Sequence, residues 1–217
     1  MIPPAAGSRP SVATEIPQVH YASPAPSWPN TYIWPVLVDI LRQFDSIEKR
    51  AFEIGCGNGA TANLLSAMGF DVTAIDPSVA GLEIAKSHFP AVKFHKGDGY
   101  EPLAGRFGTY PLVLSLEVIE HCFAPRDFLR RMFELLQDDG VGIISTPFHG
   151  YWKNLAMALV NKWDAHLDPL WDGGHIKFFS ERSLTALLRE AGFSQIRFRR
   201  AGRLYPLAKS TIAIFRR

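Results

Sequence analysis

The chain has 217 residues, a length that suits a single domain. Apolar residues make up 47% of it, which is enough for a sizeable core, and the net charge of +2 does not indicate a polyanionic partner such as nucleic acid. Its two cysteines exclude both a disulfide framework and a cysteine-based zinc site. There is no run of about 18 apolar residues and no signal-peptide pattern, so we expect a soluble cytoplasmic protein without membrane contact.

Residues 1–30 are rich in proline, so they cannot form much helix or central strand. We expect the first half of this segment to be a tail. From Gln18 onward we expect a lid that carries aromatic residues such as Tyr21 and Tyr32 over a bound ligand. The rest of the chain, 31–217, is predicted to form one domain.

Apolar residues at helical spacing predict helices in this domain, and short apolar runs predict strands. The two alternate along the chain, which favours a doubly wound α/β sheet. The predicted helices cover residues 35–44, 61–68, 77–89, 125–136, 153–163 and 181–191. The predicted strands cover residues 49–55, 70–76, 92–98, 110–116, 141–146, 195–199 and 211–215.

The turn after the first predicted strand is rich in glycine. It holds three glycines within five residues, which are Gly55, Cys56, Gly57, Asn58 and Gly59. Glycines let a ligand approach the backbone closely, and the following helix offers free N–H groups at its start. The pattern also fits the dinucleotide fingerprint. However, Glu53 precedes the first glycine by two residues, and a carboxylate there favours a cationic ligand over a pyrophosphate.

With Glu53, this turn resembles motif I of the class I S-adenosylmethionine-dependent methyltransferases, which is written E-x-G-x-G-x-G. The resemblance extends from about Glu48 to Arg217. It implies a Rossmann-like sheet of seven strands with the last strand antiparallel and helices on both faces. It also implies that S-adenosylmethionine binds at Glu53 and the glycine turn.

Two further acids end predicted strands. Asp76, followed by Pro77, lies 21 residues after Gly55, and an acid at that distance can bind both ribose hydroxyls of an adenosine ligand. NAD-dependent enzymes share this feature, so it does not separate the two classes. Asp98 and Gly99 end the third strand. The resemblance implies that this acid binds the adenine amino group.

A second group of polar residues, Glu117, Glu120 and His121, follows the fourth predicted strand. The two carboxylates are three residues apart, so on a helical turn they share a face and repel each other unless a cation lies between them. Oxygen and nitrogen donors of this kind suit Mg²⁺, Mn²⁺ or Zn²⁺. We also expect Glu117 to line the cofactor site.

This second motif looks like the E-x-x-E-H of two methyltransferase families, the ubiquinone-biosynthesis O-methyltransferases and the small-RNA ribose 2′-O-methyltransferases. The resemblance implies that both acids and His121 hold a divalent cation, Mg²⁺ or Mn²⁺. It implies a fourth ligand from the aromatic-rich insertion at 147–179, for which His175 is the candidate and His149 the competitor. Without a metal, one of these three histidines is the general base, supported by Glu120.

The favoured function is O-methylation of a small molecule. RNA ribose 2′-O-methylation is an alternative, which the near-neutral charge and the lack of an RNA-binding module disfavour. An NAD-dependent reductase is disfavoured by Glu53, and a non-catalytic subunit that binds adenosylmethionine is disfavoured by the complete set of acids and histidines. Nothing in the sequence indicates the acceptor or an oligomeric state.

Overall fold

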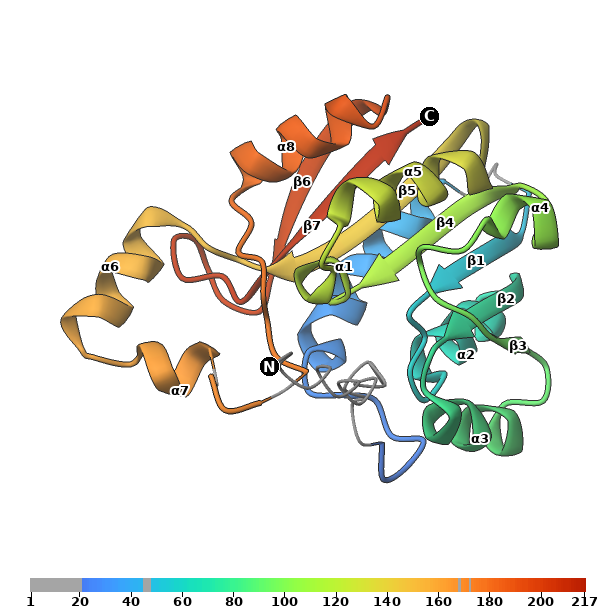
Figure 1. The fold of residues 1–217 in the computed structure, drawn as a ribbon, viewed down its shortest axis with the longest axis horizontal. Helices are drawn as coiled ribbons and strands as arrows, with labels where there is room; N and C mark the ends of the chain where they lie inside the picture. The colour runs from blue at the N-terminus through green and yellow to red at the C-terminus, as the bar shows by residue number, and fades with distance from the viewer. Residues whose placement is uncertain (1–20, 45–47, 168, 172) are drawn as a thin grey trace, which may run out of the picture.

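The alternating pattern folds into one mixed sheet in the computed structural model, which describes residues 21–44, 48–167, 169–171 and 173–217 (Figure 1). The strands are β1 (Arg50–Ile54), β2 (Asp71–Asp76), β3 (Lys93–Lys96), β4 (Tyr110–Leu116), β5 (Leu136–Pro147), β6 (Ser194–Ala201) and β7 (Ser210–Arg216). Their order is β3-β2-β1-β4-β5-β7-β6, and β7 is antiparallel to both of its neighbours. The predicted doubly wound sheet with an antiparallel last strand is therefore confirmed.

Helices cover both faces of the sheet. One apolar cluster contains α1 (Asn30–Arg42), α2 (Ala60–Ala67) and α3 (Val79–His88). The cluster on the opposite face contains α4 (Leu103–Phe107), α5 (Pro125–Leu135) and α8 (Glu181–Glu190). Two more helices, α6 (Tyr151–Leu159) and α7 (Trp163–Leu167), project away from the sheet after β5 (Figure 1). No helix among the described residues combines the length and apolar character needed to cross a membrane.

The central strand β4 is buried between the two apolar clusters that cover the sheet. Every residue of β4 is buried, as expected for a parallel strand that is covered on both faces. Leu112 and Leu114 contribute to one apolar cluster, and Val113 contributes to the other. The sequence therefore shows a continuous apolar run here rather than an alternation of apolar and polar residues.

Three predicted helix boundaries are wrong. The first helix begins at Asn30 rather than at Pro35, because Pro29 has helical backbone angles and its carbonyl accepts the first helical hydrogen bond, from Ile33 N–H. The helix predicted over 153–163 begins at Tyr151 and ends at Leu159. Asn161 then has a positive φ of 49°, which breaks the helix before α7. The five-residue helices α4 and α7 were not predicted, because one turn is too short to show a period.

We expect Leu114→Ala to lower the free energy of unfolding by about 2–5 kcal/mol, because it leaves a cavity beneath the central strand. Leu114 is fully buried and pairs with Glu53 on one side and Ile143 on the other. Leu204→Ala is the matched control, because Leu204 is 91% exposed. Urea denaturation of both variants measures the difference, and equal stability would contradict the assignment of β4 to the core.

Candidate functional site

The carboxyl ends of the parallel strands bring the predicted site residues to one edge of the sheet. The glycine turn follows β1, and the backbone N–H groups of Gly55 and Cys56 both donate to the carbonyl of Ile75 on β2, at 2.9 and 3.0 Å. The Asp76 carboxylate accepts hydrogen bonds from Gly57 N–H at 2.7 Å and from Ser78 N–H at 2.8 Å. Asp76 therefore connects the glycine turn to the start of α3.

The N-terminal arm, which we define as residues 21–29, lies across this turn. Gly57 has a positive φ of 53°, and a Cβ atom added to it would lie 2.3 Å from the Tyr21 hydroxyl. The Asn58 side-chain amide donates to the carbonyls of Ser23 and Ala25, each at 2.8 Å. Burial of the Tyr21 hydroxyl, and then the nearby carboxylate of Asp76, raise the pKa of Tyr21. Only a glycine at position 57 leaves room for this contact.

Glu53 lies beneath the glycine turn and is only 2% exposed. One of its oxygens accepts a hydrogen bond from the backbone of Ala62, whereas Oε2 has no partner among the described residues. Burial, and secondarily the charge of Asp76, raise the pKa of Glu53 to about 8. A buried carboxyl group with a free oxygen provides a place for a cationic ligand.

The other predicted cofactor residues lie around the same edge. Pro77 sits between Asp76 and the N-cap residue of α3. The Asp98 carboxylate accepts a hydrogen bond from Tyr100 N–H at 2.7 Å, which forms a local turn after β3. Gly99 packs against the ring of Phe128, since an added Cβ atom would lie 2.4 Å from it. This glycine therefore has a packing role in addition to any contact with a ligand.

Glu117, the first residue after β4, has a strained backbone and a fixed side chain. Its φ of 54° lies in the left-handed region, which costs a non-glycine residue of order 1–3 kcal/mol. Glu117 Oε1 accepts a hydrogen bond from Ser145 Oγ at 2.8 Å, and Ser210 also donates to this carboxylate. Burial raises the pKa of Glu117 to about 7. The next residue, Val118, contacts Gly55, so this turn and the glycine turn touch.

Glu120, on the short 3-10 helix η1 (Ile119–His121), is 1% exposed. Neither of its carboxylate oxygens makes a hydrogen bond of good geometry within the described part of the chain. Burial and the charge of Glu117 raise the pKa of Glu120 well above its ordinary value. Its backbone carbonyl accepts N–H bonds from Ile176 and Lys177, at 3.0 and 2.9 Å, and so holds the end of the insertion against η1.

Two histidines meet beside the Glu120 carboxyl group. The ring centroids of His121 and His175 are 4.9 Å apart, and single donor atoms of Glu120, His121 and His175 lie within 4.8 Å of one another. His121 Nδ1 lies 2.7 Å from the carbonyl oxygen of Gly173. Because a carbonyl only accepts, Nδ1 carries the proton and Nε2 keeps its lone pair.

These three residues fit a divalent cation. Their donors are one carboxylate and two imidazoles, a set that suits Mn²⁺ or Zn²⁺. Three protein ligands leave coordination positions open for other ligands. The hydrogen bond at His121 Nδ1 is the kind of outer contact that orients a histidine ligand. Glu117, which is also a predicted ligand, is not part of this group of three, and its carboxylate accepts hydrogen bonds from Ser145 and Ser210.

His149 lies apart from the three-residue group, in a second cluster at the end of β5. Its ring centroid is 5.8 Å from that of His166 and 5.3 Å from that of Phe178. Lys153 Nζ donates to the carbonyl oxygen of Phe148 at 2.8 Å. Burial, and then the charge of Lys153, lower the pKa of His149 to about 4. His149 is therefore a neutral imidazole at pH 7.

Sequence reasoning missed Ser145, Ser210, Lys153 and His166 as parts of this site. Ser145 and Ser210 lie within or at the start of apolar strands, where a serine gives no signal of its own. Lys153 and Asn154 interrupt a largely apolar helix, and that polar interruption is the signal that could have pointed toward Lys153. His166 lies in α7, which is too short to show a helical periodicity in the sequence.

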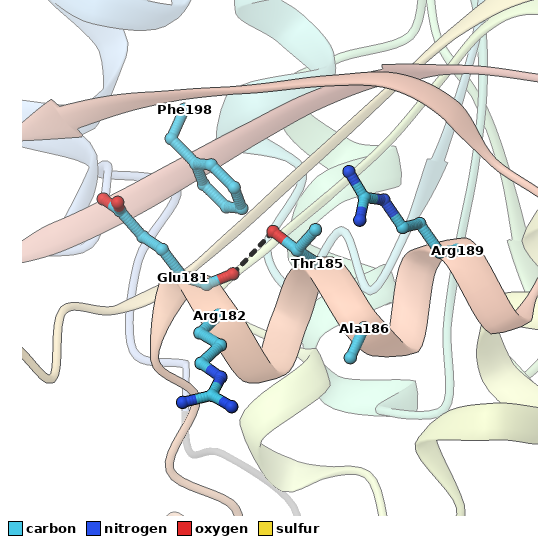
Figure 2. Close-up of a pocket in the computed structure, with 6 residues that line it drawn as sticks. All are labelled: Glu181, Arg182, Thr185, Ala186, Arg189 and Phe198. Carbon is cyan, nitrogen blue, oxygen red and sulfur yellow. Dashed lines mark hydrogen bonds between the residues drawn. The ribbon is translucent and has the colours of Figure 1, made fainter.

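A separate hollow of about 470 Å³ lies on the outer surface between α8 and β6. Figure 2 shows that its side chains do not converge: Arg182 and Arg189 point in different directions. The Thr185 hydroxyl donates back to the Glu181 carbonyl of its own helix at 2.7 Å. None of the predicted site residues lines this hollow, so it is not the candidate site.

Comparison with known proteins places the chain among methyltransferases. The family model described as a methyltransferase domain matches residues 35–197. The chain is 33% identical over 153 residues to the ubiquinone biosynthesis O-methyltransferase of Azorhizobium caulinodans, covering 66% of this chain and 58% of that protein. It is 35% identical over 117 residues to the enzyme of the same name from Caulobacter sp. strain K31, covering 51% and 45%. The aligned part thus spans about half the length of these relatives.

Solved structures share the fold at lower identity. The methyltransferase domain of bacterial CtHen1 matches with a TM-score of 0.63 and 21% identity, covering 84% of this chain and 96% of that one. The magnesium protoporphyrin IX methyltransferase of Synechocystis PCC 6803, solved with bound SAH, matches with a TM-score of 0.64 and 17% identity, covering 85% and 81%. At these identities the structural matches establish the arrangement of the sheet and helices.

We expect Glu53→Gln to stabilise the ligand-free protein increasingly as the pH rises. The pKa of Glu53 is raised from 4.5 to about 8, so the folded chain holds this proton more tightly than the unfolded chain. Stability is therefore lost as the pH rises between these values, by at most about 1.4 kcal/mol per pH unit, and the glutamine variant avoids this loss. Urea denaturation at several pH values measures the difference between the variant and the wild type. Glu83→Gln on the exposed side of α3 controls for loss of a charge, and a pH-independent difference would contradict the burial of an unpaired carboxyl.

Proposed function

Because the chain belongs to the methyltransferase domain family, whose members use S-adenosylmethionine, we propose that it transfers a methyl group to an oxygen atom of a small-molecule acceptor. The observation that carries this proposal is the contact between two groups of residues at one sheet edge. Gly55 of the glycine turn touches Val118 of the turn that bears Glu117 and Glu120. A ligand bound at the first group would present its reactive end to the second.

In this proposal the residues of the glycine turn and its neighbours hold the cofactor. The free oxygen of Glu53 would receive the cationic amino group of adenosylmethionine, and Asp76 would accept hydrogen bonds from the ribose hydroxyls. Each oxygen of Asp76 already accepts one backbone bond and has a second lone pair available. Asp98 is assigned to the adenine. The N-terminal arm would act as a lid, because Tyr21 already lies on the glycine turn.

The second group of residues prepares the acceptor. Glu120, His121 and His175 would hold a divalent cation, with Glu117 beside it, and such a cation lowers the pKa of a bound hydroxyl group. His149 is our candidate for the base, because its imidazole is neutral at pH 7 and, unlike His121 and His175, it lies outside the three-residue group that would hold the cation. The acceptor oxygen forms its bond to the methyl carbon as the carbon–sulfur bond breaks.

The proposal includes a cytoplasmic location. Cys56 and Cys122 are both buried and unpaired, as in proteins of reducing compartments. Burial raises the pKa of the Cys56 thiol well above its ordinary value and that of the Cys122 thiol to about 12. Both residues are therefore packing thiols rather than nucleophiles.

Calorimetry should show binding of adenosylmethionine and of its demethylated product, and none of NAD. Asp76→Ala should weaken cofactor binding by about 1.5–3 kcal/mol, the usual range for a hydrogen bond to a charged group. Asp71→Ala is the matched control, because Asp71 lies at the other end of β2, where it forms an exposed ion pair with Lys93. Binding of NAD in place of adenosylmethionine would refute the proposed function.

Removal of metal with EDTA should abolish methyl transfer and leave cofactor binding intact, and Mn²⁺ or Mg²⁺ should restore activity. Glu120→Gln and His175→Ala should each lower metal affinity or activity by about 10–100-fold or more. His88→Ala, on the exposed end of α3, serves as the control. Full activity of protein shown to be metal-free by elemental analysis would instead assign the reaction to a histidine base alone.

A further inference from the structure

Lys153 is a partly buried cation that the proposed chemistry does not use. It stands on the first turn of α6, and its ammonium group donates one hydrogen bond, to the Phe148 carbonyl oxygen at 2.8 Å. An ammonium group has three donors, so two remain. No carboxylate of the described residues lies within 4.0 Å of this nitrogen. A partly desolvated charge without a counter-ion is costly unless a ligand supplies one.

The position of Lys153 is inside the candidate site rather than on the outer surface. Its neighbours Tyr151 and Trp152 are 73% and 56% exposed, whereas Lys153 and Asn154 are turned inward. The hydrogen bond to Phe148 places the ammonium group next to the residue that precedes His149. Helix α6 therefore exposes Tyr151, Trp152 and Leu159 to solvent, whereas Lys153 and the buried Met157 lie on its inner face.

The electrostatic surroundings agree with this placement. Burial is the largest cause of the lowered pKa values of His149, His166 and His175, and the charge of Lys153 contributes to each of them. The same charge opposes the rise in the pKa of Glu117 that burial causes. Burial, the larger cause, lowers the pKa of Lys153 itself to about 8, with the charge of Glu117 working in the opposite direction. Lys153 is therefore still largely protonated at pH 7, within electrostatic reach of both histidine clusters.

We propose that Lys153 binds an acidic group of the methyl acceptor, so that the enzyme selects an acceptor carrying a negative charge. This inference rests on the proposed function. The carboxylate of Glu117 attracts Lys153 electrostatically but forms no ion pair with it within 4.0 Å, and it accepts hydrogen bonds from Ser145 and Ser210 instead. The sulfonium cofactor adds positive charge to the same site, and an anionic acceptor offsets it.

The rings around the histidines indicate the shape of this acceptor. Trp171 lies 5.5 Å from His121 and 6.1 Å from His175, centroid to centroid, and Phe178 lies 5.3 Å from His149. Flat side chains on both histidine clusters suit a planar ligand. A hydroxylated aromatic acid satisfies both requirements: its hydroxyl oxygen gains the methyl group and loses its proton to the base, while its carboxylate stays on Lys153.

The test compares a dihydroxybenzoate with the uncharged dihydroxybenzamide of the same substitution pattern. Calorimetry on wild-type protein saturated with the demethylated cofactor should show that the acid binds about tenfold more tightly or better, the effect of a charged hydrogen bond. Lys153→Met should abolish the preference, and Lys153→Arg should retain most of it. In turnover, Lys153→Met should raise the KM of the acid with little change in kcat.

Lys162→Met is the matched control, because Lys162 is an exposed lysine just after the same helix, and it should keep the full preference. Affinity for the demethylated cofactor is measured in every variant, so a loss there would signal a failed cofactor site and bear on the proposed function instead. The inference is overturned if the wild type binds acid and amide equally, or binds neither. It is also overturned if the preference survives in Lys153→Met. A fall in kcat for Lys153→Arg with an unchanged KM would assign Lys153 to proton transfer and would likewise overturn it.

Discussion

Two carboxyl groups buried without full hydrogen-bond partners, Glu53 and Glu120, are the constraint on which the site depends. Each follows or ends a central parallel strand, where the surrounding core excludes water. Burial raises the pKa of both groups, so their charged forms become favourable only when a cation is close. The sheet edge is therefore built to receive positive charge at two neighbouring points: the end of β1 and the turn after β4.

Backbone hydrogen bonds hold these two points in place. Asp76 fixes the glycine turn through the N–H groups of Gly57 and Ser78, and the carbonyl of Glu120 fixes the returning insertion through Ile176 and Lys177. The strained backbone of Glu117 lies between them. Strain of this kind persists only where the surrounding contacts determine the conformation, and it is typical of functional sites. The insertion is thus anchored at the site even though α6 and α7 project away from the sheet.

The two sides of helix α6 in the insertion differ in polarity. The outer side of α6 exposes aromatic and aliphatic residues, whereas Lys153 and Asn154 face the two histidine clusters. The histidines have lowered pKa values because they are buried near a cation, and they remain neutral donors of lone pairs at pH 7. Neutral imidazoles, buried carboxyl groups and the Lys153 ammonium group together agree with the proposed activation of an oxygen nucleophile next to a sulfonium.

The sequence by itself determined the alternation of strands and helices and the two motifs, because apolar periodicity and the spacing of glycines and acids are local properties of the chain. The antiparallel last strand was expected only from the resemblance of the glycine turn to motif I of the methyltransferases. The sequence also named Glu120, His121 and His175, whose donors the fold brings together. Only the tertiary structure decided that Ser145 and Ser210 donate to the Glu117 carboxylate, that His149 lies in a second cluster, and that Lys153 faces the site. The physical reason is that these relations join residues from different strands and helices. Which side chain donates a hydrogen bond to a buried polar group depends on how the strands and helices pack, and a local sequence pattern does not predict that packing.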